Sequence, residues 1–159
     1  MKQTTLAAWL EAILLGMGIC GLGVYAGAVP VLGESMVAQY PEFRRCYLPW
    51  LGLIWATAVP CYLALGCGWR IARNIGRDRC FTVTNARLLR WISVLAVWDA
   101  AVFFAGNLIY LLLNINHPGI LLLSLMVSFA GVAIAVAFAA LSYLVRRAAA
   151  LQDQSDLTI

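Results

Sequence analysis

Three polar residues interrupt stretches of sequence that are otherwise strongly apolar. Asp99 lies in "AVWDAAVFF", Glu11 lies near the start of an earlier apolar stretch, and Asn107 follows Asp99 by two helical turns. A carboxylate inside hydrocarbon is costly, and such residues often mark proton or ion paths. Two interpretations stay open for Asp99: a transport path for protons or cations, and a structural hydrogen-bonding role. We favour the structural role, because one Asp and one Asn do not make a relay.

The cysteines and the single histidine are the other residues with reactive side chains. Cys46 and Cys80 lie in different connections between apolar stretches, and the only histidine, His117, lies in a third. There is no C-x-x-C motif, so we expect neither a disulfide framework nor a metal site, and we interpret the cysteines as small apolar packing residues. Nucleophile–base pairs, phosphate loops and G-x-S-x-G motifs are also missing from the sequence. We predict no catalytic residue, no metal, no cofactor and no enzymatic activity.

The composition predicts a membrane protein. Of the 159 residues, 64% are hydrophobic and 11% are charged, and the mean hydropathy is +0.88. Soluble domains carry roughly a quarter charged residues, so this chain cannot cover itself with a surface compatible with water. Four apolar stretches exceed the length of about 18 residues that marks a candidate for a membrane-spanning helix. We predict an all-α, multi-pass membrane protein, a single domain of residues 1–159 with four transmembrane helices in one bundle, at about 6–29, 47–72, 85–114 and 118–150.

Prolines divide these stretches. We expect Pro30 and Gly33 to end the first helix, and Pro49 to lie in the first turn of the second, where its missing N–H costs little. Pro60 lies in the middle of the second helix. It should free the carbonyl of Ala56 and kink the helix there.

The basic residues predict an orientation. Arg44 and Arg45 lie in the first connection, and the other nine of the eleven Lys and Arg residues fall on the opposite side of the four helices. These nine are Lys2, Arg70, Arg73, Arg77, Arg79, Arg87, Arg90, Arg146 and Arg147. By the positive-inside rule, both termini, the middle loop and the tail are cytoplasmic. Topology therefore accounts for the pI near 9.0, and we expect no direct binding of nucleic acid.

Small residues repeat along two of the helices. Gly16, Gly23 and Gly27 recur along the first, and Gly131 belongs to a similar row in the fourth. Such rows let helix backbones approach closely in lipid. Together with the bend at Pro60, they are candidate packing positions within the bundle. A homodimer face remains the alternative.

Three features carry a resemblance to a known family: Pro30, the segment "FTVTNARLLRWI", and the last residues, "ALQDQSDLTI". The segment resembles a Phe-Ser/Thr-x-x-Asn-x-x-x-Leu pattern, and the last residues resemble Ala-x-x-Leu-x-x-Glu-x-Asp-Leu-Thr-Ile. Both patterns are found in the bacterial four-helix membrane family called domain of unknown function 2975. Gln154 or Ser155 stands where acidic or Asn residues are usual, so this tail is less negative. Members are often encoded beside small helix-turn-helix regulators of the Cro/C1 type. The resemblance implies a location in the bacterial cytoplasmic membrane and a cytoplasmic partner of that kind.

We therefore expect the middle loop and the tail to form one cytoplasmic surface that a soluble protein binds. Its candidate residues are Arg77, Arg79, Phe81, Asp153, Asp156, Leu157 and Ile159. A disordered tail that nothing binds is the alternative. The function predicted is that of a non-enzymatic membrane protein, a regulatory or anchoring partner of a cytoplasmic protein such as a helix-turn-helix regulator. A small channel or transporter that uses Asp99 is the second possibility.

Overall fold

The computed structural model describes residues 3–156, and within this range every regular element is a helix. Four continuous helical spans are long and apolar enough to cross a membrane, which confirms the predicted all-α membrane fold with four spanning helices. The elements are α1 (Gln3–Leu22), the π-helix η1 (Gly23–Ala28), α2 (Val29–Gln39), the short 3-10 helix η2 (Pro41–Phe43), α3 (Arg44–Gly76), α4 (Val83–Leu112) and α5 (Pro118–Asp156).

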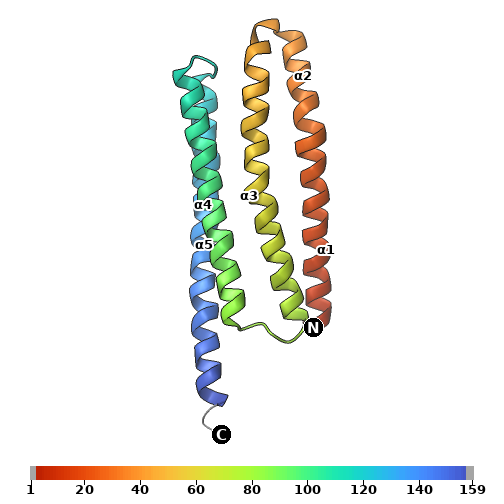
Figure 1. Cartoon of the computed structure of the whole chain (residues 1–159), viewed down its shortest axis with the longest axis vertical. Helices are drawn as coiled ribbons and strands as arrows, with labels where there is room; N and C mark the ends of the chain where they lie inside the picture. Colours follow the sequence, from red (N-terminus) through yellow and green to blue (C-terminus); the bar gives the residue numbers. More distant parts are fainter. Residues whose placement is uncertain (1–2, 157–159) are drawn as a thin grey trace.

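The helices run up and down, and neighbours in sequence are neighbours in space (Figure 1). Among the described residues, α1 packs on α3, α3 on α4 and α4 on α5, while α5 touches no helix other than α4. The two ends of the chain and the α3–α4 loop lie at the same end of the molecule (Figure 1). α5 has 39 residues. At 1.5 Å per residue it is about 58 Å long, against about 30 Å of hydrocarbon, and its last turns extend beyond the α3–α4 loop (Figure 1).

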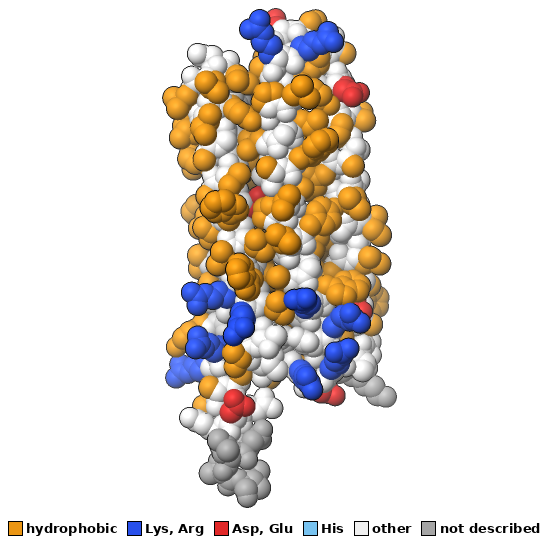
Figure 2. Space-filling view, in the orientation of Figure 1, with side chains coloured by type: hydrophobic (Ala, Val, Ile, Leu, Met, Phe, Trp, Pro, Cys, Tyr) orange, Lys and Arg blue, Asp and Glu red, His pale blue; other side chains and the backbone are white. Residues whose placement is uncertain are grey.

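The surface suits a lipid environment. On the face seen in Figure 2, a broad band of apolar side chains covers the middle of the molecule, and Lys and Arg side chains gather towards its two ends, most of them towards the end that holds the termini. Phe129 on α5 is 75% exposed, whereas Ala135 on the same helix is 1% exposed. Large residues therefore face outward and small residues face the neighbouring helix, as is usual for helices that pack in lipid.

The first helical span does not end where Pro30 and Gly33 led us to expect. The prediction that these residues close the helix near residue 29 is wrong, because the helical path continues through η1 and α2 to Gln39. Pro30 instead lies in the first turn of α2. The missing N–H of a proline is tolerated in such a position.

The π-helix explains how the chain passes Pro30. In η1 the backbone ladder shifts to bonds between residues five apart, as the bond from the Val29 N–H to the Val24 carbonyl shows. The next bond of this ladder would join residue 30 to the Tyr25 carbonyl, but Pro30 has no N–H. Trp55 on α3 supplies the donor, since its Nε1 donates to the Tyr25 carbonyl at 3.0 Å. The carbonyl that Pro30 leaves unpaired thus ties η1 to α3.

The other helix boundaries extend the predicted ones by a few residues or fall close to them. α3 begins at Arg44, so Pro49 lies in the second turn and not in the first, and both Pro49 and Pro60 are inside the helix. The ribbon of α3 bends along its length (Figure 1). The Pro49 carbonyl accepts a hydrogen bond from the Tyr110 hydroxyl at 2.8 Å, which joins α3 to α4.

The predicted packing glycines have two different environments. A Cβ added at Gly131 would lie 3.2 Å from the Ala100 Cβ, so this glycine does allow α4 and α5 to approach. A Cβ added at Gly16, Gly23 or Gly27 would meet no atom within 4 Å, so these three glycines, which we expected to pack within the bundle, have no close neighbour on another helix of the described chain.

α1 uses another face to contact α3. Gly68 of α3 lies against Leu14, a Cβ on Gly21 would lie 2.9 Å from the Tyr62 hydroxyl, and that hydroxyl donates to the Gly18 carbonyl at 2.9 Å. Apart from Glu11 and its first three residues, α1 consists of apolar and small residues on all sides. Hydropathy alone therefore could not show which of the small residues of α1 face α3.

Candidate functional site

A buried amide determines the shape of the α3–α4 loop. Asn85 on α4 is 1% exposed. Its Nδ2 donates to the carbonyls of Arg79 at 2.8 Å and Cys80 at 2.9 Å, and its Oδ1 accepts from Asn74 Nδ2 on α3 at 2.7 Å. Thr82 caps α4 by accepting a hydrogen bond from the Asn85 N–H at 3.2 Å. One side chain thus holds the loop, the end of α3 and the start of α4 together.

The end of α3 turns sharply into this loop. The Asn74 carbonyl accepts hydrogen bonds from the N–H groups of Arg77 at 3.1 Å and Arg79 at 3.0 Å. Asp78 between them has a φ of 59°, in the left-handed region. Asp is among the few residues other than glycine that enter this region. The loop is therefore a folded turn with its own hydrogen bonds.

Asn85 belongs to the segment "FTVTNARLLRWI", but we predicted no role for this residue from the sequence. A recognisable signal was present: an Asn three residues after a Thr cap, followed by an apolar run. A polar residue on the buried side of a helix's first turn needs partners, and the backbone of the preceding loop is the nearest source.

The last turns of α5 pass beside this loop. The Ser142 hydroxyl donates to the Ala86 carbonyl at 2.6 Å, which aligns this part of α5 with the start of α4. Two turns later Ala149 is only 4% exposed, and residues three and four positions further lie on the same helix face. That face borders a groove of about 410 Å³. The lining residues of this loop–tail groove are Asp78, Arg79, Cys80, Phe81, Thr82, Gln152 and Asp153.

The structure brings together part of the predicted partner surface. Arg79, Phe81 and Asp153 all line the loop–tail groove. Arg77 lines a separate groove between α3 and α4. The side chains of Asp156, Leu157 and Ile159 lie outside the described residues.

A second polar cluster lies in the middle of the spans. The Cys61 thiol of α3 donates a hydrogen bond to Asp99 Oδ2 on α4 at 3.6 Å. The Tyr25 hydroxyl of η1 in turn donates to the Cys61 sulfur at 4.0 Å. Asp99 Oδ1 is buried and has no hydrogen-bond partner within residues 3–156. Three helices therefore meet around one carboxyl group, and only a weak thiol donor serves it.

The other two intramembrane candidates lie elsewhere. Asn107 is 1% exposed, donates to the Phe103 carbonyl at 2.9 Å and accepts from Asn116 Nδ2 at 2.9 Å, so it fastens the α4–α5 connection. Eight residues separate it from Asp99, or about 12 Å along the helix. Glu11 lies on α1, and no hydrogen bond in the described part of the chain joins it to Asp99. The three residues are not joined into one polar chain.

The thiols stay separate as well. Cys20, Cys46, Cys61 and Cys67 are free cysteines on different helices or different levels of them. Within the residues that the structure describes, no group of three or more His, Cys, Asp or Glu side chains is placed to hold a metal ion.

Comparison with known proteins identifies the family. Residues 31–159 match the family model described as "Protein of unknown function (DUF2975)". The chain belongs to this family. This DUF2975 chain is also similar to the "Uncharacterized membrane protein YoaS" of Bacillus subtilis (strain 168), at 28% identity over 163 residues that cover 99% of each chain. No solved structure matches it.

The extent of the match confirms the resemblance that the loop and tail segments suggested. The matched residues include both parts of the loop–tail groove, Asn85 and Asp99, whereas Tyr25 precedes them. The chain is thus a bacterial membrane protein with four helical spans, in a family whose function is unknown.

Proposed function

We propose that this protein is a non-enzymatic membrane partner that binds a soluble cytoplasmic protein at the loop–tail groove. The observation that carries the proposal is the meeting of residues 78–82 with Gln152 and Asp153, which lie about 70 positions apart in the sequence, around one groove. The family resemblance suggests a small helix-turn-helix regulator as the partner.

The groove has exposed apolar side chains nearby that contact water unless a partner covers them. Phe81 is 56% exposed and Leu151, next to the groove residue Gln152, is 61% exposed. Trp91 lies ten residues after Phe81 and is 55% exposed. If Trp91 marks the membrane interface, as exposed tryptophans commonly do, Phe81 lies about 12–15 Å outside it. Covering such an aromatic side chain with a partner contributes about 25 cal/mol per Å² of apolar area.

The charges around this apolar surface can select the partner. Asp78 and Asp153 place carboxylates in the groove, and Arg79 places one guanidinium there. Charges at the rim of an interface affect specificity and association rate more than they affect affinity. A partner with a basic or mixed-charge surface around an apolar centre fits this arrangement.

The test uses matched aromatic substitutions at the two ends of the molecule. Phe81→Ala removes the exposed aromatic of the groove, and Phe43→Ala removes an aromatic side chain that is 50% exposed at the opposite end. The binding of a helix-turn-helix regulator encoded beside the gene is measured by titration against protein in mild detergent. Loss of an aromatic anchor at an interface costs about 2 kcal/mol, so Phe81→Ala should weaken binding by roughly 30-fold and Phe43→Ala by less than twofold.

Removal of residues 156–159 is the second arm of the experiment. The truncated protein should insert in the membrane normally and should lose the partner if the tail is part of the surface. Equal binding by wild type, Phe81→Ala and the truncated protein would refute the loop–tail groove as the binding surface.

One observation favours a second candidate, a small channel or transporter. Asp99 Oδ1 is buried at mid-span without a partner among the described residues, and this atom could accept a proton or contact a cation. Flux of protons and monovalent cations into liposomes that contain the purified protein tests this. Loss of a measurable flux in Asp99→Asn would support transport, whereas the absence of flux in the wild type would leave Asp99 with a structural role.

A further inference from the structure

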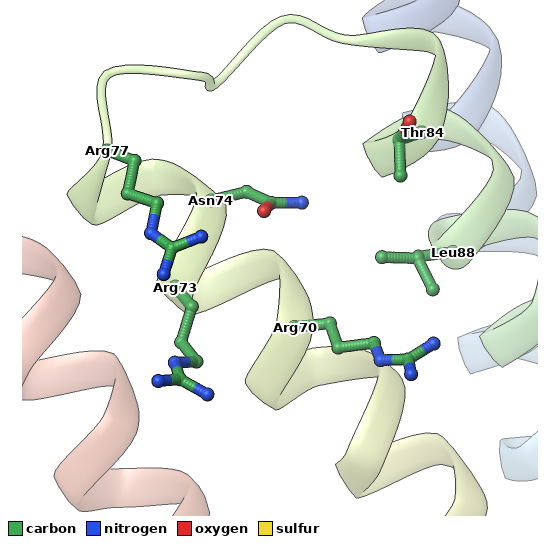
Figure 3. A pocket seen from close by; sticks show the side chains of 6 residues that line it. All are labelled: Arg70, Arg73, Asn74, Arg77, Thr84 and Leu88. Carbon is green, nitrogen blue, oxygen red and sulfur yellow. The ribbon is translucent and has the colours of Figure 1, made fainter.

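A second groove opens between α3 and α4 at the loop end of the molecule. Its volume is about 330 Å³. It is lined by Arg70, Arg73, Asn74, Arg77, Thr84 and Leu88. Figure 3 shows that the three arginines come from successive turns of α3, and that Thr84 and Leu88 face them from α4. We call this the arginine groove.

The three guanidinium groups have no anionic counterpart in the groove. None of its lining residues is acidic, and among the described side chains, those of residues 4–154, no ion pair or side-chain hydrogen bond occupies Arg70, Arg73 or Arg77. Asn74 is already committed, because its Nδ2 donates to Asn85. Clustered cations without carboxylates favour a bound anion, and guanidinium groups suit phosphate in particular because they can donate two parallel hydrogen bonds.

The positive-inside rule explains why these charges are on this side of the membrane, but not why they share a groove. Arg87 and Arg90 on α4 and Arg146 and Arg147 on α5 satisfy the same rule at the same end of the molecule, and none of them lines the arginine groove. The three arginines at positions 70, 73 and 77 occupy one face of α3, since residues three and four apart are neighbours on a helix.

Tryptophans place the groove at the depth of the lipid headgroups. Trp9 lies six residues after the start of α1, Trp69 lies seven before the end of α3, and Trp91 lies eight after the start of α4. At 1.5 Å per residue these are similar depths, about 9–12 Å from the helix ends, as expected for an aromatic belt at the membrane interface. Arg70 follows Trp69 directly, and Arg73 and Arg77 lie one and two turns further out.

We propose that the arginine groove binds the phosphate of an anionic phospholipid headgroup from the cytoplasmic leaflet. Basic pockets between spanning helices on that side of the membrane are known to suit such headgroups. The volume is at the lower end of the range of about 300–1,000 Å³ found for small-molecule sites, which suits a headgroup. Leu88 supplies the apolar wall along which the lipid chains can enter the bilayer. This site is distinct from the loop–tail groove and does not depend on a protein partner.

The experiment uses two pairs of arginines with the same spacing. R70Q/R73Q removes two charges from the groove, and R87Q/R90Q removes two from the same end of the bundle outside it. Purified protein in mild non-ionic detergent is titrated with phosphatidylglycerol or with phosphatidylcholine, and the bound lipid is counted by native mass spectrometry. In detergent the diffuse attraction of a charged bilayer surface is absent, so only a built site retains the lipid.

Wild type and R87Q/R90Q should bind phosphatidylglycerol with affinities that agree within about twofold, and should prefer it to phosphatidylcholine. R70Q/R73Q should bind it about 20-fold or more weakly, because each basic residue near a lipid phosphate contributes about fivefold. R70K/R73K, which keeps the charge and loses the bidentate geometry, should be intermediate. Unchanged helicity in circular dichroism would show that both pairs fold.

Three results would overturn the proposal. The first is an equal loss of binding in the two glutamine pairs, which would mean diffuse attraction. The second is the absence of any preference for phosphatidylglycerol in the wild type. The third is displacement of the lipid by inorganic phosphate at about 10 mM, which would show that the phosphate group alone is bound and would assign the groove to a soluble phosphate compound.

Discussion

Replacement of Asn85 by alanine should loosen the α3–α4 loop and lower the stability of the whole protein. The change removes three hydrogen bonds, at 2.7, 2.8 and 2.9 Å, and leaves Asn74 on α3 without its partner. A hydrogen bond in a protein contributes about 0.5–1.5 kcal/mol, and an unsatisfied buried group costs about 1–3 kcal/mol. Because water can reach the released loop carbonyls in part, we expect a loss of about 2–3 kcal/mol in the free energy of unfolding.

Asn107→Ala is the matched control. Asn107 is also 1% exposed and loses two hydrogen bonds, but it lies at the other end of α4. Unfolding is followed by tryptophan fluorescence as the mole fraction of a denaturing detergent rises, and amide hydrogen exchange reports on residues 77–82. Both variants should lose stability, yet only Asn85→Ala should speed exchange in the loop. Asn85→Asp should be as harmful as alanine, because it turns a carboxylate towards two carbonyl oxygens.

A loss of less than about 0.5 kcal/mol for Asn85→Ala would refute the argument that this amide anchors the loop. So would loop exchange that rises equally in the Asn85 and Asn107 variants. If the loop loosens as expected, the loop–tail groove should lose its shape, and the partner should bind more weakly even though every groove residue is intact.

Three further predictions concern other parts of the chain. Reporter fusions at both termini should give cytoplasmic signals, because most basic residues lie at that end; a periplasmic signal from a C-terminal tag would reverse the topology and remove the basis for a cytoplasmic partner. Asp99→Leu should change the free energy of unfolding by less than about 1 kcal/mol, because only a weak thiol donor at 3.6 Å serves the carboxyl group; a loss above about 2 kcal/mol in the same unfolding assay would reveal a stronger structural role. Gly33→Ala should cost about 1–3 kcal/mol, because the new methyl group would collide with the Tyr47 ring, whereas Gly16→Ala, which meets nothing within 4 Å, should be neutral or stabilising; equal effects of the two would contradict the packing of α2 on α3.

The last residues of the sequence illustrate what the two levels of description contribute. The family resemblance of "ALQDQSDLTI" and the charge of Asp153 make the tail a candidate surface from the sequence alone. Asp153 and Gln152 border a groove together with Phe81 because α5 runs past the loop. This arrangement depends on the length of α5 and on its alignment with α4. Three residues that line the groove, Arg79, Phe81 and Asp153, could be predicted from the sequence, but the other lining residues and the shape of the groove could not.

Hydropathy and length, which can be read directly along the chain, determined the class of the protein, its four spans and the end at which the arginines gather. These properties depend on the transfer of whole segments between water and hydrocarbon, so they depend little on which residues are neighbours in the folded protein.

Only the tertiary structure decided which face of each helix packs. In lipid all faces are apolar, and small residues such as Gly16 and Gly21 look equivalent until another helix lies against one of them. Three sets of hydrogen bonds join residues from different helices. Asn85 bonds to Asn74, the Trp55 side chain bonds to the Tyr25 carbonyl that Pro30 leaves unpaired, and Cys61 links Tyr25 to Asp99. Each of these arrangements is set by hydrogen bonds across interfaces, which no periodicity within a single helix encodes.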